Sequence, residues 1–325
     1  MNRSRYTLTV FALLALLGAV GVISLMVGAE RVPVAEVWRT LRVPDESLAR
    51  TIVYGLRLPR TLVAMLVGAN LGVAGAIMQG MTRNPLAGPN ILGVNSGAAL
   101  TMAALTALAP GFPLPLLPFA AFAGAAAAGI MVYGLAGSGG ITPVRLALAG
   151  VATAAMMGAL TTGLLVIREQ HATVYLWLAG SLFARTWPHL QLIAPWALVG
   201  LLMAGLSAPQ VNVLLLGEDV ARGLGVSVER IRLLLGLLVV ILAGSAVATA
   251  GPIGFVGLMV PHISRKIVGT DYRRLLPVTA VMGATLLLGA DVVARVIIAP
   301  REAPVGAVTA ALGAPFFLYL ARREG

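Results

Sequence analysis

Three arginines stand at the ends of long apolar runs. Arg57 and Arg60 lie at the start of the run 59–80, and Arg295 lies near the end of the run 275–299. If these ends reach the same side of a membrane, the three guanidinium groups share one mouth. Guanidinium groups pair well with carboxylates, so the arrangement indicates an acidic docking partner or an anionic solute. Asp291 precedes Arg295 by one helical turn, and a local ion pair is the competing interpretation.

Two amides interrupt the same apolar run. Asn70 and Gln79 lie in or near 59–80, where an amide is costly unless it finds a hydrogen-bond partner. They are therefore candidates for the lining of a pathway or for hydrogen bonds between helices. Gly68 and Gly72 have the spacing that lets two helix backbones approach closely, which predicts a packing face.

The motifs of common enzyme chemistry are absent from the sequence. It contains no G-x-x-x-x-G-K-[ST] loop for ATP, no H-E-x-x-H zinc motif and no G-x-S-x-G nucleophile motif. There is no cysteine, and His171, His189 and His262 are far apart, so no metal site is expected. We predict neither a catalytic residue nor a bound cofactor for this chain.

Carboxylates are nearly missing from the apolar runs. Asp291 is the one acidic residue inside a run, and it lies near the end. Proton- and sodium-coupled transporters usually need carboxylates within the membrane. An ion-coupled secondary transporter is therefore disfavoured, although it stays open as the alternative from another class. A purely structural membrane scaffold is a third hypothesis.

The composition is that of a membrane protein. Of 325 residues, 59% are hydrophobic and 11% charged, with a mean hydropathy of +0.94, whereas soluble domains carry about 25% charged residues. A helix of roughly 20 apolar residues crosses the hydrocarbon core. These values predict an all-α polytopic membrane protein with a single domain over 1–325. The net charge of +11 is interpreted as an orientation signal, and no nucleic-acid partner is expected.

Ten spans are predicted. The first apolar run is longer than the roughly 7–15 apolar residues of a signal peptide, so we expect it to be retained. Gly251-Pro252 separates the seventh span from the eighth. The ranges are 8–28, 59–80, 93–110, 114–136, 144–167, 188–206, 232–250, 251–268, 275–299 and 304–321.

The charges predict an orientation. Ten spans put both termini on one side, whose segments carry 13 of the 23 Lys and Arg residues and 5 of the 12 acidic residues. Because Lys and Arg are enriched in cytoplasmic connections, we expect both termini in the cytoplasm.

Four connecting segments have features of their own. Segment 29–58 is expected to carry short interfacial helices, and 174–182 a short helix on the outer face. Span 251–268 is interrupted by prolines and glycines, as are substrate passages in transporters. Connection 207–231 predicts two short helices joined at Gly223–Gly225, because Glu218 and Asp219 suit a helix start. An ordinary solvated loop is the alternative for this connection.

Nearly the whole chain resembles the permease subunit of type II ABC importers for iron-siderophores, haem, ferric citrate and cobalamin. The resemblance implies ten helices per subunit, two permease subunits (two copies or a sister pair), two cytoplasmic ATPases that hold the ATP and magnesium, a periplasmic binding protein and a place in the inner membrane. Its motifs are RLPRTL (57–62), GAIMQGMTRNPLAGPNILGVNSGA (75–98), LALAGVA (146–152), LGEDVARGLGV (216–226), AGPIGFVGLMVPHISR (250–265), RRLLPV (273–278), ADVVAR (290–295) and PVGAVTAALGAPFFL (304–318).

The resemblance also implies roles for residues. Arg57, Arg60 and Arg295 would pair with acidic residues of the binding protein. The loop 217–226 would contact the ATPase through Gly217, Glu218, Ala221, Arg222, Leu224 and Gly225. The inner gate would include Asn84 and Leu86, with Gln79 in the pathway. Family members place hydroxyl residues before the fifth span, whereas this chain has Thr142 followed by Pro143 and Val144, so the second gate residue is open.

The segments NILGVNSGA and WLAGSL are closer to iron-chelate members than to cobalamin members. The resemblance therefore favours an iron chelate, a siderophore or ferric citrate, as the solute. Haem and cobalamin are the alternatives.

Overall fold

The computed structural model describes residues 3–28, 30–137, 141–168 and 171–324, and every regular element in these ranges is a helix. The elements are α1 Arg3–Met26, α2 Val34–Arg42, α3 Leu48–Arg50, the π-helix Thr51–Arg57, α4 Leu58–Thr82, the 3-10 turn Pro89–Leu92, α5 Val94–Leu108, the 3-10 turn Leu114–Leu116, α6 Leu117–Gly137, α7 Pro143–Arg168, α8 His171–Leu178, α9 Trp187–Leu206, α10 Ala208–Leu215, α11 Glu218–Gly223, α12 Val228–Ala250, α13 Val256–Val268, α14 Tyr272–Val296 and α15 Val305–Glu324.

Each of the ten predicted spans overlaps one of these helices. Seven stretches of the described chain are long and apolar enough to cross a membrane, and Val94–Leu108 and Val305–Tyr319 are shorter apolar helices. The eighth span is the exception, because residues 251–255 are not helical and α13 begins at Val256. Gly251 and Phe255 both have positive φ. The predicted break in this span is therefore present, and the prediction that its helix starts at 251 is wrong. The thirteen helical residues of α13 cover about 20 Å.

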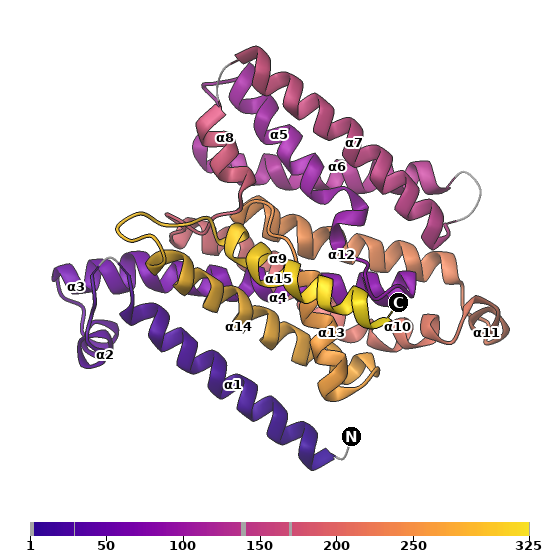
Figure 1. Ribbon diagram of the computed structural model, residues 1–325, viewed down its shortest axis with the longest axis horizontal. Helices are drawn as coiled ribbons and strands as arrows, with labels where there is room; N and C mark the ends of the chain where they lie inside the picture. The colour runs from indigo at the N-terminus through magenta and orange to yellow at the C-terminus, as the bar shows by residue number, and fades with distance from the viewer. Residues whose placement is uncertain (1–2, 29, 138–140, 169–170, 325) are drawn as a thin grey trace.

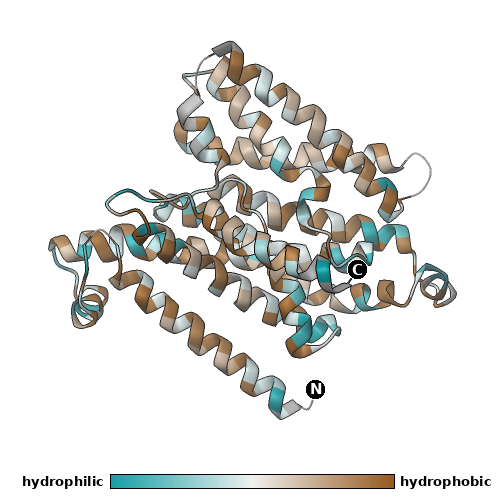
Figure 2. Cartoon of the chain, viewed as in Figure 1, coloured by the Kyte–Doolittle hydropathy of each residue, from teal (hydrophilic) through white to brown (hydrophobic). Residues whose placement is uncertain are grey.

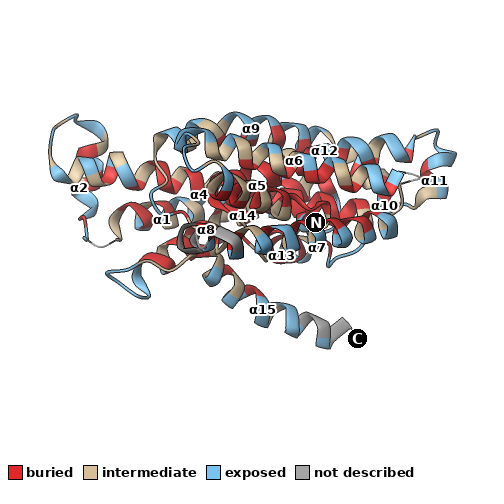
Figure 3. Ribbon diagram, turned by 90° about the horizontal axis from the view of Figure 1, so that it is seen from above, coloured by how far each residue is buried: buried red, intermediate tan, exposed pale blue. Residues whose placement is uncertain are grey.

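The helix α4 is the centre of the bundle. It contacts α14, α12, α13 and α9, and 83% of its most apolar window is buried, against 17% for α1 and 22% for α9. Figure 3 shows the buried residues gathered around α4 and α14, while α15 leaves the body. The poorly buried helices present apolar side chains outward, as expected of surfaces that face lipid or another subunit.

Glycine allows a close contact between backbones inside the bundle. A β-carbon added at Gly68 would lie 2.2 Å from Gly283 O, and one at Gly283 would lie 2.3 Å from Gly68 O. Neither distance is sterically possible for a side chain, so α4 and α14 touch backbone to backbone there. The predicted packing face at Gly68 and Gly72 is confirmed.

The two ends of the bundle are distinct. In Figure 1 both chain ends and α11 lie toward the right, whereas α2, α3 and the α14–α15 connection lie toward the left. Hydrophilic residues gather at these two ends, and the helices between them are mostly hydrophobic (Figure 2). The left-hand end is called the outer end and the right-hand end the inner end below. The helices α5, α6 and α7 pack together as a group beside α12.

The connections agree in part with the sequence. The helices α2 and α8 match the predicted short helices in 29–58 and 174–182. The π-helix Thr51–Arg57 joins α3 to α4, so the helical stretch runs over Leu48–Thr82 and is longer than predicted. In 207–231 the second of the two predicted short helices is wrong. The chain after Gly225 is the first turn of the long α12, since Val228 already lies in that helix.

Candidate functional sites at the two ends of the bundle

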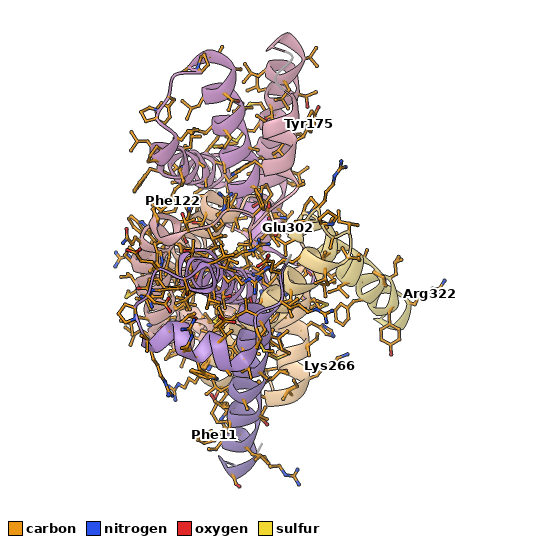
Figure 4. All side chains as sticks on the ribbon, turned by 90° about the vertical axis from the view of Figure 1, so that its left-hand side faces the viewer. Phe11, Phe122, Tyr175, Lys266, Glu302 and Arg322 are labelled. Atoms are coloured by element: carbon orange, nitrogen blue, oxygen red, sulfur yellow. The ribbon has the colours of Figure 1, made fainter. Side chains whose placement is uncertain are left out.

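Arg60 lies between two carboxylates at the outer end. Its Nη2 is 2.7 Å from Asp291 Oδ1, and its Nη1 is 2.7 Å from Glu302 Oε2. Asp291 is fully buried and also accepts from Arg295, one turn later on α14. Glu302 belongs to the α14–α15 connection and is labelled near the middle of Figure 4. Two arginines and two acids thus neutralise one another between α4 and α14.

Arg57 is held by backbone oxygens. Its Nη1 donates to the carbonyls of Leu25 and Met26 at 2.9 Å each, and its Nη2 donates to Glu30 O. Arg295 likewise donates to Ser24 O at 2.9 Å. The bonds to Ser24, Leu25 and Met26 satisfy carbonyls at the end of α1, which lack partners within the helix.

The structure therefore brings together the three arginines that the sequence singled out, and it buries them. Arg57, Arg60 and Arg295 are 7%, 9% and 4% exposed. The local Asp291–Arg295 pair is confirmed, while docking of a binding protein on these arginines stays a prediction. Sequence reasoning missed Glu302 and Arg185, although counting spans puts both at the outer end.

A cavity of about 330 Å³ adjoins this cluster. Arg57, Arg60, Arg185 and Arg295 line it together with Glu30 and Glu302. With Asp291 behind Arg60, the cavity is surrounded by four cations and three carboxylates. An anion is the ligand that such a surrounding would accept.

The amides of α4 bind neighbouring helices. Asn70 Nδ2 donates to Ser245 Oγ on α12 at 3.2 Å. Gln79 Nε2 donates to Leu258 O at 3.3 Å, and Gln79 Oε1 accepts from Arg265, which places it against α13. The interpretation of hydrogen bonds between helices is confirmed for both residues, while a pathway role for Gln79 stays a prediction.

The predicted gate residues lie in two different places. Asn84 Oδ1 accepts from Leu86 N at 2.9 Å, which forms a turn after α4. Leu86 is 47% exposed and lines a small hollow with Phe255 and Phe316. Thr142 directly precedes α7, and its hydroxyl accepts from Arg145 N in the first turn of that helix at 3.3 Å.

Val144, two residues after Thr142, is 67% exposed. Exposure of Leu86 and Val144 at the inner end agrees with surfaces that a second subunit or a solute could reach. The gate assignment itself stays a prediction for Asn84, Leu86, Thr142 and Val144.

Glu218 connects three segments at the inner end. It is the first residue of α11, and its Oε1 accepts from Arg232 Nη2 on α12 at 2.7 Å. The Nη1 of the same arginine donates to Ile141 O at 2.8 Å, next to the start of α7. Tyr133 on α6 donates to Arg232 O at 2.9 Å. The side chain of Arg232 is 3% exposed, so this is a buried contact between α11, α12 and the α6–α7 connection.

The remaining predicted coupling residues lie in α11 or directly beside it. Gly217 and Gly225 flank the helix with φ of +106° and +77°, which glycine adopts at little cost. Ala221 is buried, whereas Arg222 pairs with Glu229 at 2.9 Å and is half exposed. Leu224 is 63% exposed and follows Val220 and Leu216, which are 51% and 59% exposed. These three leucine and valine side chains recur every four residues, and sequence reasoning named only Leu224.

Metal ligands do not gather in the described part of the chain, which holds no group of three or more His, Cys, Asp or Glu side chains suited to an ion. His189 and His262 lie on α9 and α13 respectively. The prediction that this chain holds no cofactor of its own stays a prediction.

Comparison with known proteins matches residues 15–323 to the FecCD transport family. The chain belongs to this family. It is 46% identical over 322 residues to the Fe(3+)-citrate import system permease protein YfmD of Bacillus subtilis, covering 99% of this chain and 96% of that protein. It is 42% identical over 320 residues to the Fe(3+) dicitrate transport system permease protein FecD of Escherichia coli, covering 97% and 98%.

A solved structure has the same fold. A metal-chelate type ABC transporter in an inward-facing conformation superposes with a TM-score of 0.85 at 32% identity, covering 97% of this chain and 98% of that one. The chain is thus a multi-pass membrane permease of an ABC import system, and ATP hydrolysis belongs to a separate subunit. The resemblance found in the sequence is confirmed, and so is the all-helical fold.

Proposed function

We propose that this permease carries an iron chelate, a siderophore or ferric citrate, from the periplasm to the cytoplasm. The support is the match along nearly the full length to permeases whose names specify ferric citrate and iron hydroxamate. The apolar helices contain few carboxylates, which agrees with power from ATP on a partner and not from an ion gradient. Haem and cobalamin are less favoured solutes.

Uptake by a reconstituted assembly tests this proposal. The permease is placed in liposomes with its ATPase and its binding protein, and radiolabelled ferric citrate, a ferric hydroxamate, a ferric catecholate, haem and cobalamin are offered in turn. We expect ATP-dependent uptake of one iron chelate, abolished by an ATPase variant that cannot hydrolyse ATP. Uptake by the permease alone that stops when the ion gradient collapses would establish the secondary transporter instead.

The inner end is proposed as the ATPase contact. The helix α11 is short, is flanked by Gly217 and Gly225, and exposes Val220, while Leu216 just before it and Leu224 just after it are also exposed. Exposed apolar side chains on and beside a short polar helix suit a groove of a partner protein. The buried Glu218–Arg232 contact would carry a movement of α11 toward Ile141 and the start of α7. Both termini would then lie in the cytoplasm of a cell with this protein in its inner membrane.

The outer end is proposed as the docking site of the binding protein. It follows from this orientation that the α2–α3 connection and the arginine cluster face the periplasm. Arg57, Arg60 and Arg295 would contribute to the positive potential there, which steers an acidic partner. A second permease subunit, identical or a sister chain, would cover poorly buried helices and complete a gate that includes Asn84, Leu86, Thr142 and Val144.

A further inference from the structure

The four arginines around the outer cavity differ in what they already bind. Arg60 and Arg295 pair with Asp291, and Arg60 also pairs with Glu302. Arg57 donates to three backbone carbonyls. An incoming carboxylate would have to break buried contacts to engage any of these three, and such contacts are costly to leave unmade.

Arg185 has no comparable partner. Among the described residues no carboxylate lies within 4 Å of its guanidinium, and its Nε is buried without a hydrogen-bond acceptor. Its polar neighbour is His189, and Arg185 Nη1 lies 3.3 Å from His189 Nε2. Burial and the repulsion of Arg60 lower the pKa of Arg185 to about 10, so it remains a cation at neutral pH.

The histidine cannot serve Arg185 as an acceptor. His189 Nδ1 already accepts from Thr186 N at 3.3 Å. A neutral imidazole has one acceptor nitrogen, and the other carries the hydrogen. Because Nδ1 is the acceptor, Nε2 carries the hydrogen and faces another donor in Arg185. The cation is therefore positioned beside the cavity with a buried Nε–H that has no acceptor among the described residues.

The surroundings of Arg185 suit a protein partner. Phe183 is 62% exposed and Leu56 is 52% exposed, and both line the cavity. An apolar rim that excludes water around an arginine is the anatomy of strong contacts between proteins. Trp187 fixes the segment from the other side, because its Nε1 donates to Tyr54 O at 3.1 Å.

We propose that Arg185 is the arginine of this cavity that receives a carboxylate side chain of the periplasmic binding protein, with Phe183 and Leu56 covered in the same contact. The proposal rests on the function proposed above and refines it. Arg60 and Arg295 keep the cavity in shape, and Arg185 makes the new ion pair when the partner docks.

Docking of the binding protein to the detergent-solubilised permease–ATPase assembly tests this proposal. Arg185→Glu should weaken docking about tenfold or more, because it replaces an attraction by a repulsion at close range. Arg185→Lys should lose less than Arg185→Gln. The matched control is Arg301→Glu, an exposed outer arginine outside the cavity, which should change docking by at most about twofold. Unchanged unfolding temperature and basal ATP hydrolysis show that the variants fold.

Charge reversal then identifies the partner residue. One Asp→Arg or Glu→Arg variant on the binding protein should restore docking to the Arg185→Glu permease. If wild type docks and Arg185→Glu docks equally well, the proposal is overturned while the proposed function stands. Normal docking with lost uptake also overturns it, since the carboxylate would then belong to the solute. A wild-type assembly that docks no binding protein would reject the proposed function itself.

Discussion

The charged clusters at the two ends of this permease are built from the same types of side chain, but they differ in how deeply those side chains are buried. At the outer end Asp291, Arg295 and Arg60 have side chains that are 0%, 3% and 10% exposed, and they join α14 to α4. At the inner end Arg222 and Glu229 are about half exposed, and Glu218 is a quarter exposed. Buried pairs are costly to break and exposed pairs are not. The outer cluster therefore fixes the structure. At the inner end the exposed Arg222–Glu229 pair can rearrange when a partner moves α11, while Arg232, which is 3% exposed, keeps α11 joined to α12 through Glu218.

Removing the charge of Asp291 should have the largest effect on stability. Asp291→Asn leaves the buried Arg60 and Arg295 without their shared carboxylate, and breaking such a contact costs about 3–5 kcal/mol. Thermal unfolding of the purified permease measures the loss. Glu302→Gln is the matched control, since the Glu302 side chain is 28% exposed, and its effect should be much smaller. Equal losses for the two variants would contradict the assignment of Asp291 as the centre of the cluster.

Neutralising Glu218 should have an intermediate effect of another kind. Glu218→Gln leaves Arg232 buried without its ion pair, which costs about 1–3 kcal/mol, and detaches α11 from the α6–α7 connection. We expect several-fold slower uptake with ATP hydrolysis retained in proteoliposomes. The neighbour Asp219 is exposed, so Asp219→Asn serves as the control and should transport normally. Normal uptake by Glu218→Gln would show that this contact carries no movement.

Truncating Arg222 should cost little stability. Its side chain is 52% exposed and shared between Glu218 and Glu229, and exposed pairs contribute little to stability because water and salt screen them. Arg222→Ala should therefore unfold within a degree or two of wild type. A fall as large as that of Asp291→Asn would remove the contrast between the two ends.

Lowering the pH should produce the smallest effect on stability, through Asp271 at the inner end of α14. A hydrogen bond from Asn212, helped by Arg273 N, holds the pKa of Asp271 below its ordinary value. A carboxyl with a lowered pKa stabilises the fold above its unfolded pKa of about 4, and this contribution disappears as the pH falls through the folded pKa. Unfolding temperatures of wild type and Asp271→Asn should differ at pH 6 and converge near pH 3. A difference that stays constant with pH would refute the role of this ionisation.

Hydropathy was sufficient to predict the helices but not their partners. The apolar runs located the spans, because membrane helices must satisfy their own backbone hydrogen bonds. The predicted helix start at 251 was wrong, because Gly251 and Phe255 adopt positive φ although the sequence around them is apolar. Counting spans placed Arg57, Arg60 and Arg295 at one end, yet Arg60 and Arg295 are buried against Asp291 and Glu302, and Arg57 is buried against backbone carbonyls. The contact between Glu218 and Arg232 joins residues on either side of a turn, and the hydrophobic periodicity of the sequence does not predict the geometry of that turn.

The ratio of ATP hydrolysed to chelate imported tests the contrast between the two ends most directly. It is measured in proteoliposomes for wild type, Glu218→Arg, Arg232→Glu and the variant with both changes. The structure predicts that each single reversal raises the ratio several-fold, and that the double reversal restores most of the coupling because the ion pair forms again with its charges exchanged. Single variants with the wild-type ratio, or a double variant as uncoupled as the singles, would contradict the role of this contact.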